Sequence, residues 1–210
     1  KKRFDVASNS ASQANIKLLI DAEESWMQRA ADELCTDLMA KYNQKKVVVF
    51  NTLQCYRWDR LDYLKEEHKK ALANGYKLGY KIVRGAYLEK ENERAEAMGY
   101  KSPICETKEA TDTCFNEVLN YILNNLSEIE LFIGTHNEES TSLAIHQMKE
   151  KKIAKNDSRV WFGQLYGMSD HITFNLAKLG YGVGKYIPFG PVKDVMPYLI
   201  RRAEENTSVA

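Results

Sequence analysis

The chain has 210 residues, which is enough for one domain with a substantial hydrophobic core. Its 30 basic and 29 acidic residues give a formal net charge of +1, so neither nucleic acid nor an anionic membrane surface is expected as its main partner. No apolar stretch approaches the roughly 20 residues of a membrane span, and the N-terminus lacks a signal-peptide core. We therefore expect a soluble intracellular protein.

Cysteine and histidine usage argues against two further classes. The four cysteines show no close pairing in the sequence, which favours free thiols in a reducing compartment over a disulfide framework. The four histidines are equally scattered, and this spacing is unlike that of zinc ligands. A metal centre is therefore not expected.

Short apolar runs alternate with amphipathic segments along the whole chain. A weak helical pattern over residues 1–15 comes first, and Asn74-Gly75 is a pair suited to ending a helix. The expected strands cover residues 16–20, 47–54, 78–83, 131–133, 159–162 and 184–187. The expected helices cover 26–42, 61–73, a segment ending near Gly99, 111–126, a segment after Asn137, 169–177, and a closing helix from about 192.

Six strands separated by helices, without hairpin signals, indicate parallel strands joined by helical crossovers. An open doubly wound sheet and a closed (β/α)8 barrel both fit this order. Polar residues follow every strand, however, and only a barrel brings all of those ends to one mouth. These strand ends hold Asp21, Gln54, Arg84 with Tyr87, Thr135-His136-Asn137, Gln164 and Tyr186.

The barrel is therefore the preferred fold: α/β, a distorted (β/α)8 TIM-type barrel of which this chain holds about six of the eight βα units. We expect residues 1–210 to form a single catalytic domain, the C-terminal three-quarters of the barrel, without its two leading units.

Familiar catalytic motifs are absent from the sequence. The glycines near 182 have the wrong spacing for a dinucleotide-binding turn, and neither a phosphate-binding loop nor a nucleophile elbow is found. Lys81 lies within a strand, where alternation predicts that it shares one side with Val83 while Ile82 and Arg84 share the other. A lysine there is costly unless it is paired or faces an anion. Asp21 is equally well explained as an N-cap of the next helix.

The closing helix carries a polar face of Tyr198, Arg201, Arg202 and Glu205. Two guanidiniums beside phenols suit a small carboxylate, because each offers a planar fork of donors. A solvated helix face is the alternative.

Taken together, the strand ends resemble the proline dehydrogenase family, which are flavin-dependent oxidases of proline built on a distorted (β/α)8 barrel. The resemblance covers nearly the whole chain in order. The sequences of several motifs look like those of the branch shared by mitochondrial and some bacterial monofunctional enzymes. It is carried by Leu18-Leu19-Ile20-Asp21-Ala22-Glu23, Asn51-Thr52-Leu53-Gln54, Lys81-Ile82-Val83-Arg84-Gly85-Ala86-Tyr87, Gly134-Thr135-His136-Asn137, Gly163-Gln164-Leu165-Tyr166-Gly167-Met168, Tyr186-Ile187-Pro188-Phe189-Gly190 and Tyr198-Leu199-Ile200-Arg201-Arg202-Ala203-Glu204-Glu205-Asn206.

The resemblance implies FAD across the barrel mouth, hydride transfer from L-proline to flavin N5, and the product 1-pyrroline-5-carboxylate. It implies a quinone as electron acceptor, reached through peripheral membrane contact, and a location in the cytoplasm of a bacterium or on the matrix side of a mitochondrion. Asp21 and Lys81 are the implied catalytic residues. The implied substrate-binding residues are Tyr87, Leu165, Tyr186, Tyr198, Arg201 and Arg202. The implied FAD-binding residues are Ile20, Gln54, Lys81, Arg84, Gly85, Ala86, Thr135, His136, Asn137, Gln164 and Glu205.

Two departures from the family pattern stand out. Many bacterial members have an arginine where this chain has Lys81, and lysine keeps the charge without the planar fork. The family also places a substrate-site lysine on an early strand that is not part of these 210 residues.

Three alternatives stay open. The first is a hydroxyproline dehydrogenase, a sister branch in which a smaller residue replaces the phenol of Tyr186. The second is a non-catalytic barrel fragment that binds anions without flavin. The third is a phosphate-handling barrel enzyme that uses Arg84 and Arg201.

Overall fold

A computed structural model describes the backbone of residues 1–207 and the side chains of residues 1–200. Six strands form one sheet in which every neighbouring pair is parallel. The strands are β1 (Leu18–Leu19), β2 (Val49–Gln54), β3 (Leu78–Val83), β4 (Ile129–Gly134), β5 (Val160–Leu165) and β6 (Val183–Tyr186).

The spatial order of the strands is their order in the chain, from β1 to β6. An open doubly wound sheet instead reverses its order at a switch point, where the crossover helices change face. Here no reversal occurs, so the sheet curls in one sense as the staves of a barrel do. The predicted barrel-type fold is confirmed, in the form of a curled half-barrel of six parallel strands.

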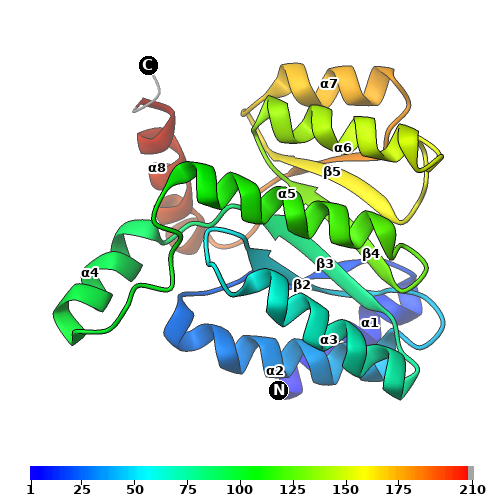
Figure 1. Ribbon diagram of the computed structural model, residues 1–210, viewed down its shortest axis with the longest axis horizontal. Helices are drawn as coiled ribbons and strands as arrows, with labels where there is room; N and C mark the ends of the chain where they lie inside the picture. Colours follow the sequence, from blue (N-terminus) through cyan, green and yellow to red (C-terminus); the bar gives the residue numbers. More distant parts are fainter. Residues whose placement is uncertain (208–210) are drawn as a thin grey trace.

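The helices cover one side of this sheet. In Figure 1, α2, α3, α5, α6 and α7 pack over it, while α8 stands apart at the left. The helices are α1 (Lys2–Ala14), α2 (Ser25–Tyr42), α3 (Arg60–Asn74), α4 (Leu88–Met98), α5 (Lys108–Asn124), α6 (Glu138–Glu150), α7 (Asp170–Lys178) and α8 (Val192–Thr207).

Alternation along the strands separates an outer face from an inner one. In β3, Leu78, Tyr80 and Ile82 are completely buried on the outer face, under the helices. Lys81 and Val83, which alternate with Tyr80 and Ile82, are only half-buried on the inner face. The predicted split of Lys81 and Val83 from Ile82 is therefore confirmed. The hydrophobic core lies between the sheet and its helices, and the inner face is left for other groups.

Some element boundaries differ from the predicted ones. The first strand is only Leu18–Leu19, because it lies at the edge of the sheet and pairs on one side alone. Helix α5 begins three residues earlier than predicted, at Lys108, because the side chain of Thr107 caps it by accepting a hydrogen bond from the Ala110 amide. The weak pattern of the first 15 residues does form a helix, α1, which packs against α2.

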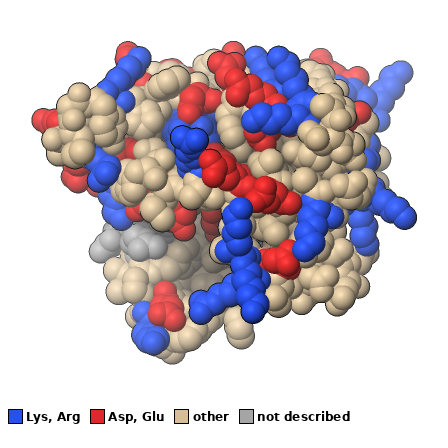
Figure 2. Space-filling model, turned by 90° about the horizontal axis from the view of Figure 1, so that it is seen from below, with Lys and Arg blue, Asp and Glu red and all other residues tan. Residues whose placement is uncertain are grey.

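Charges of both signs are mixed over the surface seen in Figure 2. This agrees with the balanced composition and offers no broad basic face for nucleic acid. Among the helices of residues 1–207, none is both long and apolar enough to cross a membrane.

Candidate active site

The mouth of the half-barrel is the edge where the carboxyl ends of the parallel strands meet. Lys81, on the inner face of β3, reaches Asp21, which follows β1, and the two side chains form an ion pair. The Asp21 side chain is 63% exposed and that of Lys81 is 18% exposed, so the pair is open to the mouth. The predicted cost of a lysine in a strand is thus offset by an opposite charge. Asp21 does not cap α2, whose N-cap residue is Glu24.

Gln54, at the end of β2, ties the neighbouring strand ends together. Its side-chain oxygen accepts a hydrogen bond from the Ala86 amide at 3.1 Å, and its side-chain nitrogen donates to the Glu23 carbonyl at 2.9 Å. The side chain is buried, and both of its polar atoms are therefore satisfied by the loops after β1 and β3. Gln54 thus holds these two loops beside each other.

Arg84 points to the opposite side of the sheet from Lys81. Its guanidinium donates to Asp112 of α5, to Thr135 after β4, and to Ser140 of α6, over distances of 2.6 to 3.0 Å. The guanidinium also lies 4.8 Å from the centre of the Phe115 ring. Burial opposes ionisation of Asp112, but the hydrogen bonds from Arg84 outweigh it and lower the pKa of that carboxyl. Arg84 therefore anchors the helices behind the mouth, and its contact with FAD stays a prediction.

The ends of β4 and β5 form a second set of hydrogen bonds. Gln164 donates to the Thr135 carbonyl at 3.2 Å and accepts from Thr173 at 2.7 Å. His136 Nδ1 lies 2.9 Å from the hydroxyl oxygen of Ser169, a residue in the left-handed conformation with φ 49°. Asn137 caps α6, because its side-chain oxygen accepts from the Ser140 amide at 2.7 Å.

The loop from Gly85 to Tyr87 continues the mouth beyond β3. Gly85 has φ 150°, and a Cβ at this position would lie 2.5 Å from the ring of Tyr56, so glycine is required. Gly85 and Ala86 are exposed, while Tyr87 is half-buried at the N-cap position of α4. Ile20 is buried at the end of β1 and is bonded through its backbone to β2, with its amide donating to the Phe50 carbonyl.

Two phenols meet at the last strand. The ring of Tyr186 packs edge-to-face against that of Tyr198 on α8, with centres 5.6 Å apart and planes at 65°. Leu165 pairs with Tyr186 across β5 and β6 and is half-buried. The structure therefore brings together Tyr186, Tyr198 and Leu165, and their enclosing of a proline ring stays a prediction. Arg201, Arg202 and Glu205 lie outside the residues whose side chains the structure describes.

Three glycines lie side by side on the last three strands. Gly134, Gly163 and Gly184 are aligned in register across β4, β5 and β6. The Phe132 ring packs over Gly163, where a Cβ would lie 2.2 Å from it, and Val83 packs over Gly134, where a Cβ would lie 2.9 Å from it. A Cβ on Gly184 would meet nothing nearer than the Phe132 ring, at 4.0 Å. Beside these side chains, Lys81 presents a cation on the inner face, and a cation fits an anionic cofactor such as FAD. Among the described residues, no cluster of His, Cys, Asp or Glu is arranged to hold a metal ion.

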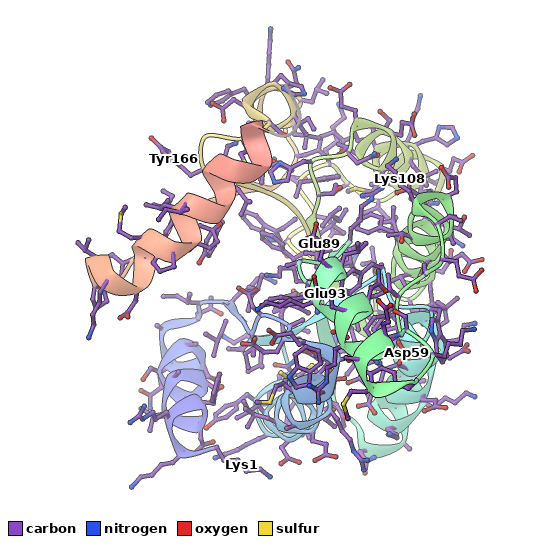
Figure 3. All side chains as sticks on the ribbon, turned by 90° about the vertical axis from the view of Figure 1, so that its left-hand side faces the viewer. Lys1, Asp59, Glu89, Glu93, Lys108 and Tyr166 are labelled. Atoms are coloured by element: carbon purple, nitrogen blue, oxygen red, sulfur yellow. The ribbon has the colours of Figure 1, made fainter. Side chains whose placement is uncertain are left out.

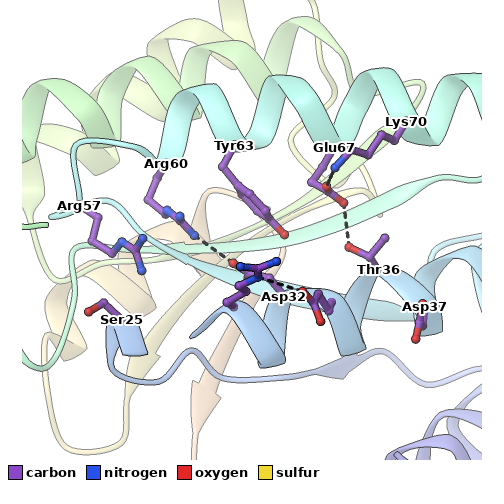
Figure 4. A pocket seen from close by; sticks show the side chains of 11 residues that line it. Ser25, Asp32, Thr36, Asp37, Arg57, Arg60, Tyr63, Glu67 and Lys70 are labelled. Atoms are coloured by element: carbon purple, nitrogen blue, oxygen red, sulfur yellow. Dashed lines mark hydrogen bonds and ion pairs between the residues drawn. The ribbon is translucent and has the colours of Figure 1, made fainter. Parts of the chain in front are cut away.

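A separate cavity of about 390 Å³ lies outside the barrel mouth, between α2 and α3 (Figure 4). Arg60 donates to Asp32 at 3.2 Å and to Asp59 at 2.6 Å, and Glu67 bonds Thr36 and Lys70. Burial opposes ionisation of Asp59, but hydrogen bonds from Arg60 and Arg57 outweigh it and hold the pKa of Asp59 below its usual value. These charges pair with each other, so the network joins two helices.

Sequence reasoning missed three residues next to the predicted site. Ser169 contacts His136, Asp112 contacts Arg84, and Glu91 contacts Ser25 at the start of α2. Each lies on a different segment of the fold from its partner, at a sequence separation that no local pattern reveals. One signal was available, because Ser169 stands immediately before a helical pattern, as capping residues do. The four cysteines are free thiols, as predicted.

Comparison with known proteins places this geometry in a family. Residues 3–210 match the family model described as Proline dehydrogenase. The chain is 40% identical over 211 residues to the human protein Proline dehydrogenase 1, mitochondrial, covering 99% of this chain and 35% of that protein. It is 39% identical over 204 residues to the carbapenem antibiotics biosynthesis protein CarD of Pectobacterium carotovorum, covering 97% of this chain and 52% of CarD.

A solved structure shares the fold. The chain superposes on proline utilization A from Bdellovibrio bacteriovorus, inactivated by N-propargylglycine, with a TM-score of 0.90 and 24% identity, covering 98% of this chain and 21% of that one. The chain spans about a third of the length of the human relative. The family match over almost every residue decides the assignment: this chain belongs to the proline dehydrogenase family.

Proposed function

We propose that this chain supplies the flavin- and proline-binding face of an FAD-dependent proline dehydrogenase, which oxidises L-proline to 1-pyrroline-5-carboxylate and passes electrons to a quinone. The observation that carries the proposal is the ion pair of Asp21 and Lys81 at the strand ends of a family member. When bound, FAD supplies the hydride acceptor, at its N5 atom. The chain's own residues supply binding, orientation and charge.

Lys81 presents a positive charge on the inner face, and Asp21 fixes the position of that charge. A preorganised cation stabilises negative charge that develops on a reduced flavin, because it needs no rearrangement during the reaction. Lys81, His136 and the backbone of Gly85 and Ala86 are proposed to hold the cofactor at the carboxyl ends of the strands. Ile20, Gln54, Arg84, Thr135, Asn137 and Gln164 border the same edge, and Glu205 is proposed to join them.

The substrate is proposed to lie between the cofactor and α8. Arg201 and Arg202 are proposed to bind its carboxylate, because a guanidinium offers two parallel donors to a carboxylate. Leu165, Tyr87 and the phenol pair of Tyr186 and Tyr198 would enclose the ring and exclude water. Oxidation would break the C–H bond next to the ring nitrogen and release a proton from that nitrogen, leaving a C=N bond, and bound FAD would supply the acceptor for the hydride.

The spectrum of the purified protein tests the cofactor. A protein that takes up FAD should show two visible flavin bands, and these bands should persist after gel filtration. A colourless protein that also fails to bind added FAD would favour the alternative of an anion-binding fragment. Binding of phosphate esters without redox activity would favour the phosphate-handling alternative.

Tyr186 favours proline over hydroxyproline as the substrate. Its ring packs against that of Tyr198, and we propose that this phenol fills the space that the 4-hydroxyl of hydroxyproline needs, since a smaller residue stands at this position in the sister branch. Replacing Tyr186 by Ser should therefore shift the ratio of kcat/KM values towards hydroxyproline by about tenfold. Initial rates with both substrates measure the ratio, and faster turnover of hydroxyproline by the unaltered protein would overturn the choice.

This proposal places the protein at a membrane surface where a quinone is available, in a bacterial cytoplasm or on the matrix side of a mitochondrion. Mitochondrial and bacterial proteins are both among its relatives.

A further inference from the structure

Helix α4 is held to the rest of the molecule by a buried carboxylate. Only Glu91 and Ala95 of its residues are buried, and Glu91 is completely inaccessible to solvent. Its neighbours Glu89 and Glu93, labelled in Figure 3, are exposed. A carboxylate is costly to bury unless its oxygens accept hydrogen bonds, so the partners of Glu91 decide what it does.

Those partners lie at the first residue of α2. Glu91 Oε1 accepts from the Ser25 amide at 2.5 Å, and Glu91 Oε2 accepts from the Ser25 hydroxyl at 2.6 Å. The N-terminus of a helix has amide groups without partners inside the helix, and it favours a negative charge. The N-cap residue of α2, Glu24, forms no capping bond with its side chain. Glu91 therefore caps α2 from another helix.

Two further contacts surround this one. Lys90 forms an ion pair with Glu24 at 3.3 Å, and the guanidinium of Arg94 lies 4.5 Å from the centre of the Trp26 ring. The N-cap residue Glu24 and the first two residues of α2, Ser25 and Trp26, thus each contact α4. The outer two contacts are exposed and contribute little, whereas the middle one joins the half-buried Ser25 to the fully buried Glu91.

The two segments joined in this way carry proposed site residues. Asp21 precedes Ser25 by four residues, and Tyr87 precedes Glu91 by four. Gln54 joins the same two loops at a second point, through Glu23 and Ala86. With one tie lost, the loops would be joined at the other alone, and the spacing of Asp21 and Tyr87 would be less fixed.

We propose that Glu91 is a positioning residue, which sets the spacing of Asp21 and Tyr87 by capping α2 from α4. This inference rests on the proposed function for its effect on proline, but the contact itself is independent of that function. A glutamine keeps one acceptor and replaces the other with a donor, which would face the donors of Ser25. Glu91→Gln should therefore fall between the unaltered protein and Glu91→Ala.

The experiment compares Glu91→Ala, Glu91→Gln and the matched control Glu89→Ala, an exposed glutamate on the same helix. The first measurement is the KM for proline and kcat per bound flavin. Glu91→Ala should raise KM about tenfold, because a small displacement of binding groups is enough for such a loss. Glu91→Gln should lie between, and Glu89→Ala should match the unaltered protein.

The second measurement is hydrogen exchange of the backbone amides in the cofactor-free protein. Exchange in residues 21–26 and 86–91 should be faster in Glu91→Ala and unchanged in Glu89→Ala. If Glu91→Ala does not fold, Ser25→Ala removes one of the two bonds more gently and takes its place.

A Glu91→Ala protein with lowered thermal stability but unaltered KM and unaltered exchange in these loops would overturn the proposal, because the contact would then serve stability alone. If the unaltered protein binds FAD but does not oxidise proline, the proposed function fails, and hydrogen exchange still decides the role of Glu91.

Discussion

Asp21 and Lys81 form an ion pair at the mouth of the half-barrel, and Asp32 and Arg60 form another between α2 and α3. The second pair has side chains only 10% and 6% exposed, and Asp59, Gln28 and Asn51 complete its hydrogen bonds. The first pair is more open and lies on the face of the sheet that the helices leave uncovered. A cluster of charges beside a cavity is therefore not in itself a reaction site, because charges that pair with each other offer a ligand little unpaired charge and few free hydrogen-bonding groups.

Removing one partner of the buried pair should lower the stability of the fold. Arg60→Met would leave the buried Asp32 without its cation, while Asp59 would keep its ion pair with Arg57, and this should cost about 3 kcal/mol of unfolding free energy. Urea unfolding measures the loss. The control is Arg29→Met on α2, whose side chain is 90% exposed and whose change should stay within about 0.5 kcal/mol. Equal effects of the two substitutions would contradict the assignment of the network to stability.

Removing the cation at the mouth should act on catalysis instead. Lys81→Met should lower kcat/KM for proline about 100-fold, since a preorganised charge beside the reacting group is lost. Lys81→Arg keeps the charge and should retain most of the activity. Steady-state kinetics with each protein, normalised to bound flavin, give the ratio. If Lys81→Met keeps normal kinetics but unfolds more easily, the ion pair of Lys81 and Asp21 serves only to stabilise the fold, as the pair of Asp32 and Arg60 does.

The smallest expected effect is on the pH dependence of stability, compared between the unaltered protein and Asp59→Asn. The pKa of Asp59 is lower in the folded protein than in the unfolded chain. The ionised carboxylate therefore contributes its full stabilisation at pH values above the pKa of the unfolded chain, which is near 4. That stabilisation is lost as pH falls through the pKa of the folded protein. Melting temperatures measured from pH 7 to pH 2 should therefore converge for the unaltered protein and Asp59→Asn in acid. Asp62→Asn, at a side chain that is 84% exposed, is the control and should follow the unaltered protein throughout.

The fold was largely predictable from the sequence because its signals are local. The outer residues of β3 and β4 read as apolar runs, and glycine follows α3 and α4 in the left-handed conformation, as expected at helix ends. The first strand was predicted too long, since pairing at a sheet edge depends on the neighbouring strand and not on the run itself.

The candidate site was predictable only in part. The motif residues are the ones at the strand ends, but the partners of Arg84 and Gln54 lie on helices and loops that only the fold brings near. Glu91 looked like one of several charges on a solvated helix, and burial alone distinguishes it from Glu89. Long-range capping of this kind leaves no periodic signal in the sequence.

The most direct test of the account is the visible spectrum of the flavin-loaded protein before and after L-proline is added without oxygen. The flavin bands should bleach, and 1-pyrroline-5-carboxylate should form in an amount equal to the flavin reduced. Bands that persist at saturating proline, in a protein that holds its flavin, would contradict the proposed function.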